Sequence, residues 1–170
     1  MSETLEPALP DHLDEQAERL MRRICEKQIK LATAESCTGG MLAALLTDIE
    51  GCGHGFDRGF VTYSNEAKQE LLGIEPELLK RNDAVSEVVA RAMAEGALNR
   101  SKAGIAVAVT GFAGPGAPGQ EEGRVHVALA RRGASTAHRE EHFGAIGRGA
   151  IRVNSLKVML DMLEQALREE

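Results

Sequence analysis

The chain of 170 residues lacks the features of a nucleic-acid-binding or membrane protein. It has no tryptophan, 1 tyrosine, 4 phenylalanines and a formal net charge of -6. It therefore offers few aromatic platforms for stacked bases and no excess of positive charge for a phosphate backbone. Its apolar runs are all shorter than the ~20 residues that a membrane helix needs. We expect neither nucleic acid nor a membrane as a partner.

Cysteine is scarce, and no secretion signal is evident. The 3 cysteines are an odd number without the spacing of a metal site, which suits a reducing compartment. The N-terminus is acidic, whereas a secretory signal begins with basic residues followed by an apolar stretch. We expect a cytoplasmic protein with one domain over residues 1–170, of which residues 1–10 form a loose tail. We propose no metal site and no cofactor.

The pattern of apolar residues predicts alternating helices and strands that end in a hairpin. The expected strands are Leu31–Ala34, Phe60–Tyr63, Ile105–Thr110, Val125–Ala130 and His138–Phe143. The expected helices begin at Asp11 and Pro76 and span Met41–Ile49, Ser64–Leu72, Glu87–Arg100 and Ile151–Arg168, with loops over Gly51–Gly59 and Gly111–Gly123. This order predicts an α/β fold, a three-layer α/β/α sandwich with a mixed, mostly parallel sheet.

Ser36 lies where the first predicted strand hands over to a helix, in the segment TAESCTGG (residues 33–40). Ligands of open α/β sheets bind at such strand ends, and free amides there receive an anion or an oxyanion. Gly39 and Gly40 leave room for a substrate to approach the backbone. Ser36 is therefore a candidate nucleophile. The alternatives are that Ser36 or Thr38 only caps the helix, or that Cys37 is the nucleophile.

Tyr63 and Lys68 follow in the segment FVTYSNEAK (residues 60–68). A serine nucleophile needs a base, and a lysine serves as one when burial or a nearby cation lowers its pKa. A tyrosine hydroxyl can relay the proton or hold the serine. Both residues would face Ser36 if their strands were neighbours. The alternative for Lys68 is a solvated position on its helix.

A second glycine-rich loop, TGFAGPG (residues 110–116), follows the strongest predicted strand and either cradles an anion or forms an ordinary long turn. Arg148 and Arg152 lie four residues apart at the start of the last helix, where a bound anion would explain two cations. His138 and His142 are also four apart, but on a strand they would be too far apart to share one metal ion.

Together these segments resemble the CinA C-terminal domain family. The matching motifs are AESCTGG (34–40), GFVTYSNEAK (59–68), AVSE (84–87), MAEG (93–96) and TGFAGP (110–115), in family order over residues 15–168. The resemblance implies a three-layer α/β/α fold and deamidation of nicotinamide mononucleotide to nicotinate mononucleotide and ammonia. It implies catalysis by Ser36 with Lys68 and Tyr63, without a metal or cofactor. We also expect a homo-oligomer and a small-molecule substrate as the partner. The implied substrate-binding residues are Glu35, Thr38, Gly39, Gly40, Thr110, Gly111, Gly114 and Arg148.

Two segments depart from the family pattern. Residues 116–123 (GAPGQEEG) form a shorter loop that lacks the usual Lys-Pro-x-Gly ending. Residues 144–148 (GAIGR) lack the acidic residue of a Gly-Asp-Arg turn. Both departures fall in loops that would hold the substrate. The alternative to an enzyme is a non-catalytic domain that binds a nucleotide or phosphometabolite. A DNA-uptake role is disfavoured by the acidic composition.

Overall fold

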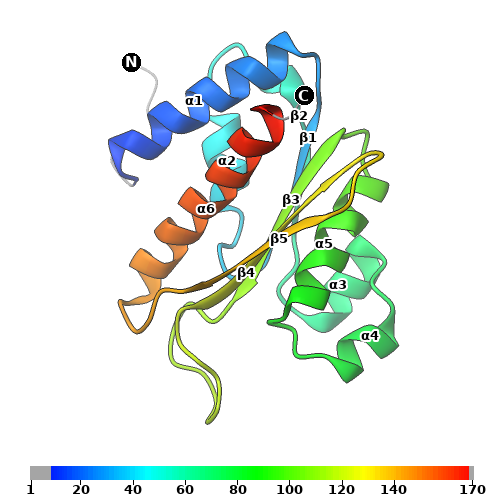
Figure 1. Cartoon of the computed structure of the whole chain (residues 1–170), viewed down its shortest axis with the longest axis vertical. Coiled ribbons are helices and arrows are strands. Elements are labelled where there is room, and N and C mark those ends of the chain that lie inside the picture. The colour runs from blue at the N-terminus through cyan, green and yellow to red at the C-terminus, as the bar shows by residue number, and fades with distance from the viewer. Residues whose placement is uncertain (1–8, 169–170) are drawn as a thin grey trace.

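A computed structural model describes residues 9–168 of the chain (Figure 1). In chain order the elements are α1 (Asp11–Glu26), β1 (Leu31–Glu35), α2 (Met41–Thr47), a 3₁₀ turn (Gly53–Gly55), β2 (Phe56–Val61), α3 (Asn65–Leu72), α4 (Pro76–Arg81), α5 (Glu87–Asn99), β3 (Ile105–Gly111), β4 (Arg124–Arg131), β5 (Ala137–His142) and α6 (Arg148–Arg168). No helix in this range is both long and apolar enough to cross a bilayer.

The strands form one mixed sheet in the order β2-β1-β3-β4-β5. β1 is parallel to β2 and β3, whereas the pairs β3–β4 and β4–β5 are antiparallel. The prediction of a mostly parallel sheet was therefore wrong. The reason is that residues 112–123 and 132–136 contain no helix that would carry the chain back across the sheet. A strand that follows such a direct connection pairs antiparallel with the strand before it.

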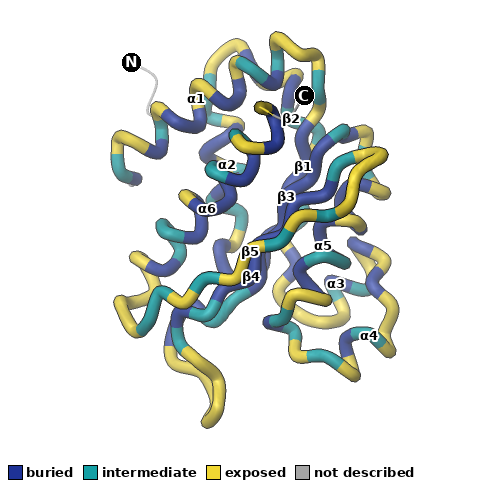
Figure 2. Tube along the Cα trace, in the orientation of Figure 1, coloured by how far each residue is buried: buried dark blue, intermediate teal, exposed yellow. Residues whose placement is uncertain are grey.

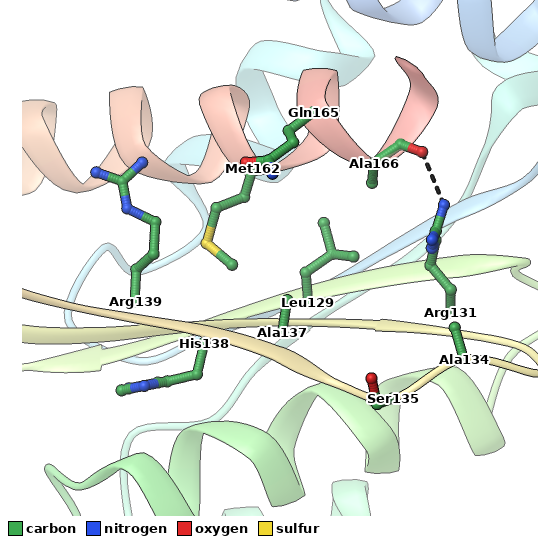
Figure 3. A pocket seen from close by; sticks show the side chains of 10 residues that line it. All are labelled: Leu129, Arg131, Ala134, Ser135, Ala137, His138, Arg139, Met162, Gln165 and Ala166. Atoms are coloured by element: carbon green, nitrogen blue, oxygen red, sulfur yellow. Dashed lines mark hydrogen bonds between the residues drawn. The ribbon is translucent and has the colours of Figure 1, made fainter. Parts of the chain in front are cut away.

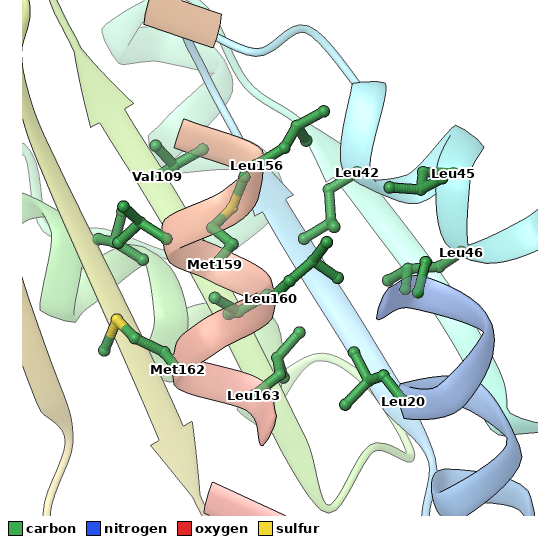
Figure 4. Close-up of a cluster of buried hydrophobic side chains, with 14 of the residues drawn as sticks. Leu20, Leu42, Leu45, Leu46, Val109, Leu156, Met159, Leu160, Met162 and Leu163 are labelled. Carbon is green, nitrogen blue, oxygen red and sulfur yellow. The ribbon is translucent and has the colours of Figure 1, made fainter. Parts of the chain in front are cut away.

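Helices cover both faces of the sheet, and the two faces are packed differently. On one side α1, α2 and α6 enclose a core of leucines and methionines (Figures 1 and 4). On the other side α3, α4 and α5 pack over a face on which the buried apolar strand residues are alanines. These are Ala32, Ala34, Ala106, Ala108, Ala128 and Ala130. Side chains alternate between the faces of a strand, so the small residues let α5 approach this face closely.

Most predicted elements are present, with shifted boundaries at the edges. The strand expected at Phe60–Tyr63 spans Phe56–Val61 instead, so part of the predicted loop Gly51–Gly59 belongs to β2. β2 is an edge strand, and its half-exposed residues, among them Asp57 and Arg58, give no alternating apolar pattern. α2 ends at Thr47 rather than Ile49, and α6 begins at Arg148 rather than Ile151. Residues 1–8 of the predicted tail lie outside the described residues, and Leu9 is buried.

Candidate active site

Ser36 lies directly after β1 at the carboxyl end of the parallel strands, as predicted. Hydrogen bonds to both neighbouring strands hold this point of the backbone. The Ser36 amide donates to the carbonyl of Val109 in β3 at 3.1 Å. On the other side, the Thr62 amide after β2 donates to the Glu35 carbonyl at 2.9 Å. The candidate nucleophile is thus carried by the rigid centre of the sheet rather than by a free loop.

Glu35 caps the helix that follows the turn and does not face a substrate. Its side chain is fully buried. Its carboxylate accepts hydrogen bonds from the Leu42 amide at 3.1 Å, the Ala43 amide at 2.9 Å and the Thr38 hydroxyl at 2.5 Å. The resemblance implied substrate binding by Glu35 and Thr38, whereas their side chains bind each other. The first amides of α2 are occupied, so they do not receive an anion as expected.

Two glycines shape the turn between Ser36 and α2. Gly39 and Gly40 have φ of +62° and +96°, a conformation that residues with a side chain rarely adopt. A Cβ on Gly40 would also lie 3.2 Å from Cγ2 of Val61. Within the described chain, the amides of Thr38 and Gly40 have no hydrogen-bond acceptor. Thr38 is fully buried and Gly40 is partly exposed, so the Gly40 amide, rather than those of the helix, is available to a ligand beside Ser36.

Lys68 is buried beneath Ser36, with a side chain that is only 1% exposed. Its Nζ donates to Ser36 Oγ at 3.4 Å, to the Thr62 carbonyl at 3.2 Å and to the Tyr63 carbonyl at 3.1 Å. No carboxylate among the described residues pairs with it. Burial lowers the pKa of the Lys68 ammonium below that of an ordinary lysine. The alternative of a solvated lysine is therefore contradicted.

Lys68 reaches Ser36 because α3 begins at a fixed point. The Ser64 hydroxyl accepts a hydrogen bond from the Ala67 amide at 3.0 Å and caps the helix. β1 and β2 are neighbours, so the first turn of α3 lies next to the turn after β1. The predicted proximity of the two segments is thereby confirmed.

Cys37 and Tyr63 occupy places that differ from their candidate roles. Burial raises the pKa of the Cys37 thiol to about 12, so it is a protonated packing residue at neutral pH rather than a competing nucleophile. Tyr63 contacts Lys68 through its carbonyl oxygen, while the residue is 74% exposed. Its hydroxyl has no hydrogen bond to Ser36 or Lys68 among the described contacts.

The second glycine loop lies beside the Ser36 turn but is built for packing between strands. The buried Thr110 hydroxyl donates to the Ala84 carbonyl at 2.8 Å. A Cβ on Gly111 would lie 2.7 Å from Cγ2 of Val125 in β4, so this glycine permits close contact between the strands. Gly114 packs under the Arg148 guanidinium, whose Nη2 would lie 2.9 Å from a Cβ on this glycine.

Arg152 contacts the Ser36 turn directly, which its place in the sequence did not show. Its Nη2 donates to the Thr38 carbonyl at 2.8 Å and would lie 3.3 Å from a Cβ on Gly39. Its Nε is buried without a hydrogen-bond partner in the described chain. Arg148 is one helical turn away and exposed. The four-residue spacing was the signal that brings both arginines to one side of α6.

A family model described as the CinA C-terminal domain matches residues 13–167. The chain belongs to the CinA C-terminal domain family. It is 43% identical over 157 residues to the CinA-like protein of Geobacter sulfurreducens, a match that covers 91% of this chain and 37% of the relative. The chain spans about a third of the length of the curated relatives that it matches.

Solved CinA structures extend the similarity over nearly the whole chain. The competence/damage inducible protein CihA from Agrobacterium tumefaciens has a TM-score of 0.90 and 43% identity, with 99% of each chain covered. The CinA superfamily protein from Escherichia coli has a TM-score of 0.85 and 32% identity, over 97% of this chain and 99% of that chain. The CinA fold is therefore shared by experimentally determined relatives.

A cavity lies away from Ser36, at the far edge of the sheet between the β4–β5 hairpin and the end of α6 (Figure 3). It has a volume of about 330 Å³ and contains none of the predicted site residues. Its lining includes His138, whose Nε2 lies 3.0 Å from Nδ1 of His126. Within the described residues no group of three or more His, Cys, Asp or Glu side chains is arranged to hold a metal ion. We therefore take the Ser36 site as the candidate active site.

Proposed function

We propose that the chain is an amidohydrolase that converts nicotinamide mononucleotide to nicotinate mononucleotide and ammonia, with Ser36 as nucleophile and Lys68 as general base. The observation that carries the proposal is the buried hydrogen bond between Lys68 Nζ and Ser36 Oγ, 3.4 Å long. Ordinary lysines are charged at neutral pH and do not accept protons. Burial lowers the pKa of Lys68, so its neutral, proton-accepting form is easier to reach than that of an ordinary lysine.

In the first half of the reaction, neutral Lys68 takes the hydroxyl proton while Ser36 Oγ bonds to the carboxamide carbon. The carbonyl electron pair moves to oxygen, and the amide of Gly40 donates to that oxyanion. When the tetrahedral intermediate collapses, the C–N bond breaks and the leaving nitrogen takes the proton from Lys68. Ammonia departs, and an acyl ester remains on Ser36.

In the second half, water attacks the ester carbon and passes a proton to Lys68. The bond between carbon and Ser36 Oγ then breaks, and the oxygen recovers the proton from Lys68. The carboxylic acid product ionises to nicotinate. This sequence resembles the triad logic of serine hydrolases, with a buried lysine in place of histidine. It needs no metal or cofactor.

The substrate's phosphate would be bound by cations at the start of α6. Arg152 lies against Gly39 and Thr38, and its buried Nε has no hydrogen-bond partner in the described chain. Arg148 lies over Gly114 on the other glycine loop. Two guanidinium groups on one side of the site favour an anionic substrate. These contacts support the resemblance to nicotinamide-nucleotide amidohydrolases.

The deciding experiment measures ammonia released from nicotinamide mononucleotide by the purified chain. Ser36→Ala should lower the rate by about 10³-fold or more, because no nucleophile remains. Ser135→Ala removes an exposed hydroxyl from the β4–β5 turn and is the matched control, which should keep the wild-type rate. Equal rates for Ser36→Ala and the control would contradict the nucleophile. Saturable binding of the nucleotide by wild-type chain without ammonia release would favour the non-catalytic alternative.

A further inference from the structure

Tyr63 is a large aromatic residue left in solvent at the edge of the candidate active site. It is 74% exposed, and Val61 two residues earlier is 50% exposed. A single exposed apolar residue is ordinary on a protein surface. What sets Tyr63 apart is that its backbone belongs to the site while its ring has no partner in it.

The backbone of Tyr63 is fixed on both sides. The preceding residue, Thr62, extends the β1–β2 ladder through its amide bond to the Glu35 carbonyl. The Tyr63 carbonyl accepts a hydrogen bond from Lys68 Nζ at 3.1 Å. The following residue, Ser64, caps α3. The ring therefore has a defined origin and only its own two torsion angles to search.

The alternation of side chains at the end of β2 indicates on which side the Tyr63 ring lies. Val61 lies against Gly40, because a Cβ on Gly40 would be 3.2 Å from Cγ2 of Val61. Thr62 is fully buried, and successive side chains of an extended chain leave on opposite sides. The same alternation, continued past Thr62, places Tyr63 on the side of Val61, which is the side of the Gly39–Gly40 turn.

The reacting group of a substrate has to come close to the backbone from which this ring extends. An attacked carboxamide carbon lies about 3–3.5 Å from the nucleophile Ser36 Oγ. Ser36 Oγ and the Tyr63 carbonyl are 3.4 and 3.1 Å from the same ammonium nitrogen. A planar ring attached to that carboxamide must leave the buried Ser36–Lys68 pair towards solvent. Tyr63 is the exposed aromatic residue at that exit.

We infer that the Tyr63 ring stacks on the aromatic ring that carries the substrate carboxamide, and so selects aromatic over aliphatic amides. This inference rests on the proposed function and deepens it. Val61 extends the apolar surface of the platform towards Gly40. The phenol hydroxyl is then not needed as a proton relay, because Lys68 contacts Ser36 directly.

Kinetics of two substitutions separate stacking from proton relay. Removal of one stacked aromatic partner weakens binding by about 5- to 100-fold, so Tyr63→Ala should raise KM for nicotinamide mononucleotide by that factor. Tyr63→Phe keeps the ring and should restore KM to within about threefold of wild type. Leu71→Ala removes another exposed side chain, 45% exposed on α3, and should leave KM unchanged. A kcat of Tyr63→Phe as low as that of Ser36→Ala would overturn stacking in favour of the relay.

Tyrosine fluorescence reports the contact without turnover, because the chain has 1 tyrosine and no tryptophan. In the Ser36→Ala background, nicotinamide mononucleotide should quench Tyr63 emission saturably. Ribose 5-phosphate carries the same phosphate without the aromatic ring and should not quench it. The double variant with Tyr63→Phe gives the baseline for absorption by the ligand. Unchanged emission at saturating nucleotide, or absence of any nucleotide binding, would overturn the inference.

The two experiments also separate this inference from the proposed function. If the wild-type chain releases no ammonia but the nucleotide quenches its Tyr63 emission, the stacking inference stands and the proposed hydrolase activity is refuted. If the wild-type chain releases ammonia and the Tyr63→Ala variant has an unchanged KM, the proposed hydrolase activity stands and the stacking inference is refuted.

Discussion

Two glycine-rich loops lie side by side at the carboxyl ends of the neighbouring parallel strands β1 and β3, and glycine serves a different purpose in each. The segment Ser36–Gly40 follows β1, and residues 112–123 follow β3. In the first, glycines with positive φ open the backbone beside the buried Ser36–Lys68 pair. In the second, glycines let backbone segments touch one another, and the tip is exposed (Figure 2).

Gly123 illustrates the second use. Its φ is +84°, and a Cβ there would lie 2.4 Å from the Gly144 carbonyl oxygen. Its amide donates to the Phe112 carbonyl at 2.8 Å, which closes the base of the loop. Beyond this base, residues 115–121 are exposed. The same residue type therefore indicates a ligand site in one loop and chain packing in the other. A glycine count cannot tell the two apart.

The largest expected effect comes from substitution of Lys68, the proposed base that contacts Ser36 in the first loop. Arginine keeps the positive charge but cannot be deprotonated in a protein, so Lys68→Arg should lose about 10²- to 10⁴-fold in kcat/KM, nearly as much as Lys68→Ala. Lys80→Arg, at an exposed lysine on α4, should behave as wild type. Steady-state kinetics, with circular dichroism to check folding, measure both. A Lys68→Arg chain with wild-type turnover would refute the general base.

The pH profile of wild type tests the same residue without a substitution. A general base works when it is neutral, so kcat/KM should rise with pH through the pKa of Lys68. Burial lowers that pKa, so the midpoint should lie below the ~10.4 of an ordinary lysine. A profile that falls with rising pH would contradict this assignment.

Much of this architecture could be predicted from the sequence, in particular strands that are buried on both faces and helices whose capping residue is a sequence neighbour. Ile105–Thr110 was predicted from its run of small and branched apolar residues, all of which are buried, and the helix Ser64–Leu72 was predicted where Ser64 caps α3. The start of β2 was missed because an edge strand has exposed residues on both sides. The direction of β4 was also missed, because strand pairing depends on the path of the loop before it.

The site divides in the same way. Local spacing identified Ser36 and Lys68, but only the fold shows that Lys68 is buried and touches Ser36. The inward direction of Glu35 and the outward direction of Tyr63 depend on which neighbours cover each residue. A side chain's environment is a tertiary property, so residue type alone did not distinguish a helix cap from a substrate ligand at Glu35.

A matched pair of glycine substitutions sharpens the comparison between the loops. Gly40 and Gly119 have similar φ, +96° and +88°, but Gly40 faces Val61, whereas a Cβ on Gly119 would meet nothing within 4 Å. Both changes to alanine should lower the free energy of unfolding by about 1 kcal/mol or more through backbone strain. Only Gly40→Ala should also lower kcat/KM, by about 10-fold, because its amide lies beside Ser36.

Denaturant unfolding and ammonia-release kinetics on the same preparations measure the two effects separately. Equal loss of activity in both variants would mean that the second loop takes part in catalysis. Full activity in Gly40→Ala would remove its amide from the proposed oxyanion contacts.

The smallest expected effect concerns the tether between the second loop and β5. His142 Nδ1 lies 2.7 Å from Glu121 Oε1, and this hydrogen bond raises the pKa of the exposed His142 above its ordinary ~6.5. A pKa that is higher in the folded state means that protonation favours folding. The contribution of the pair is fully present below pH ~6.5 and is lost as the pH rises through the folded-state pKa. Solvent screens an exposed pair, so global stability should change little.

An NMR titration should therefore show the His142 midpoint falling in Glu121→Gln, with the resonances of residues 115–121 following the same titration in wild type. The Ser36 turn should not follow it, because its contacts to Val109 and Glu35 involve no histidine. An unchanged midpoint in Glu121→Gln would show that the contact does not persist in solution.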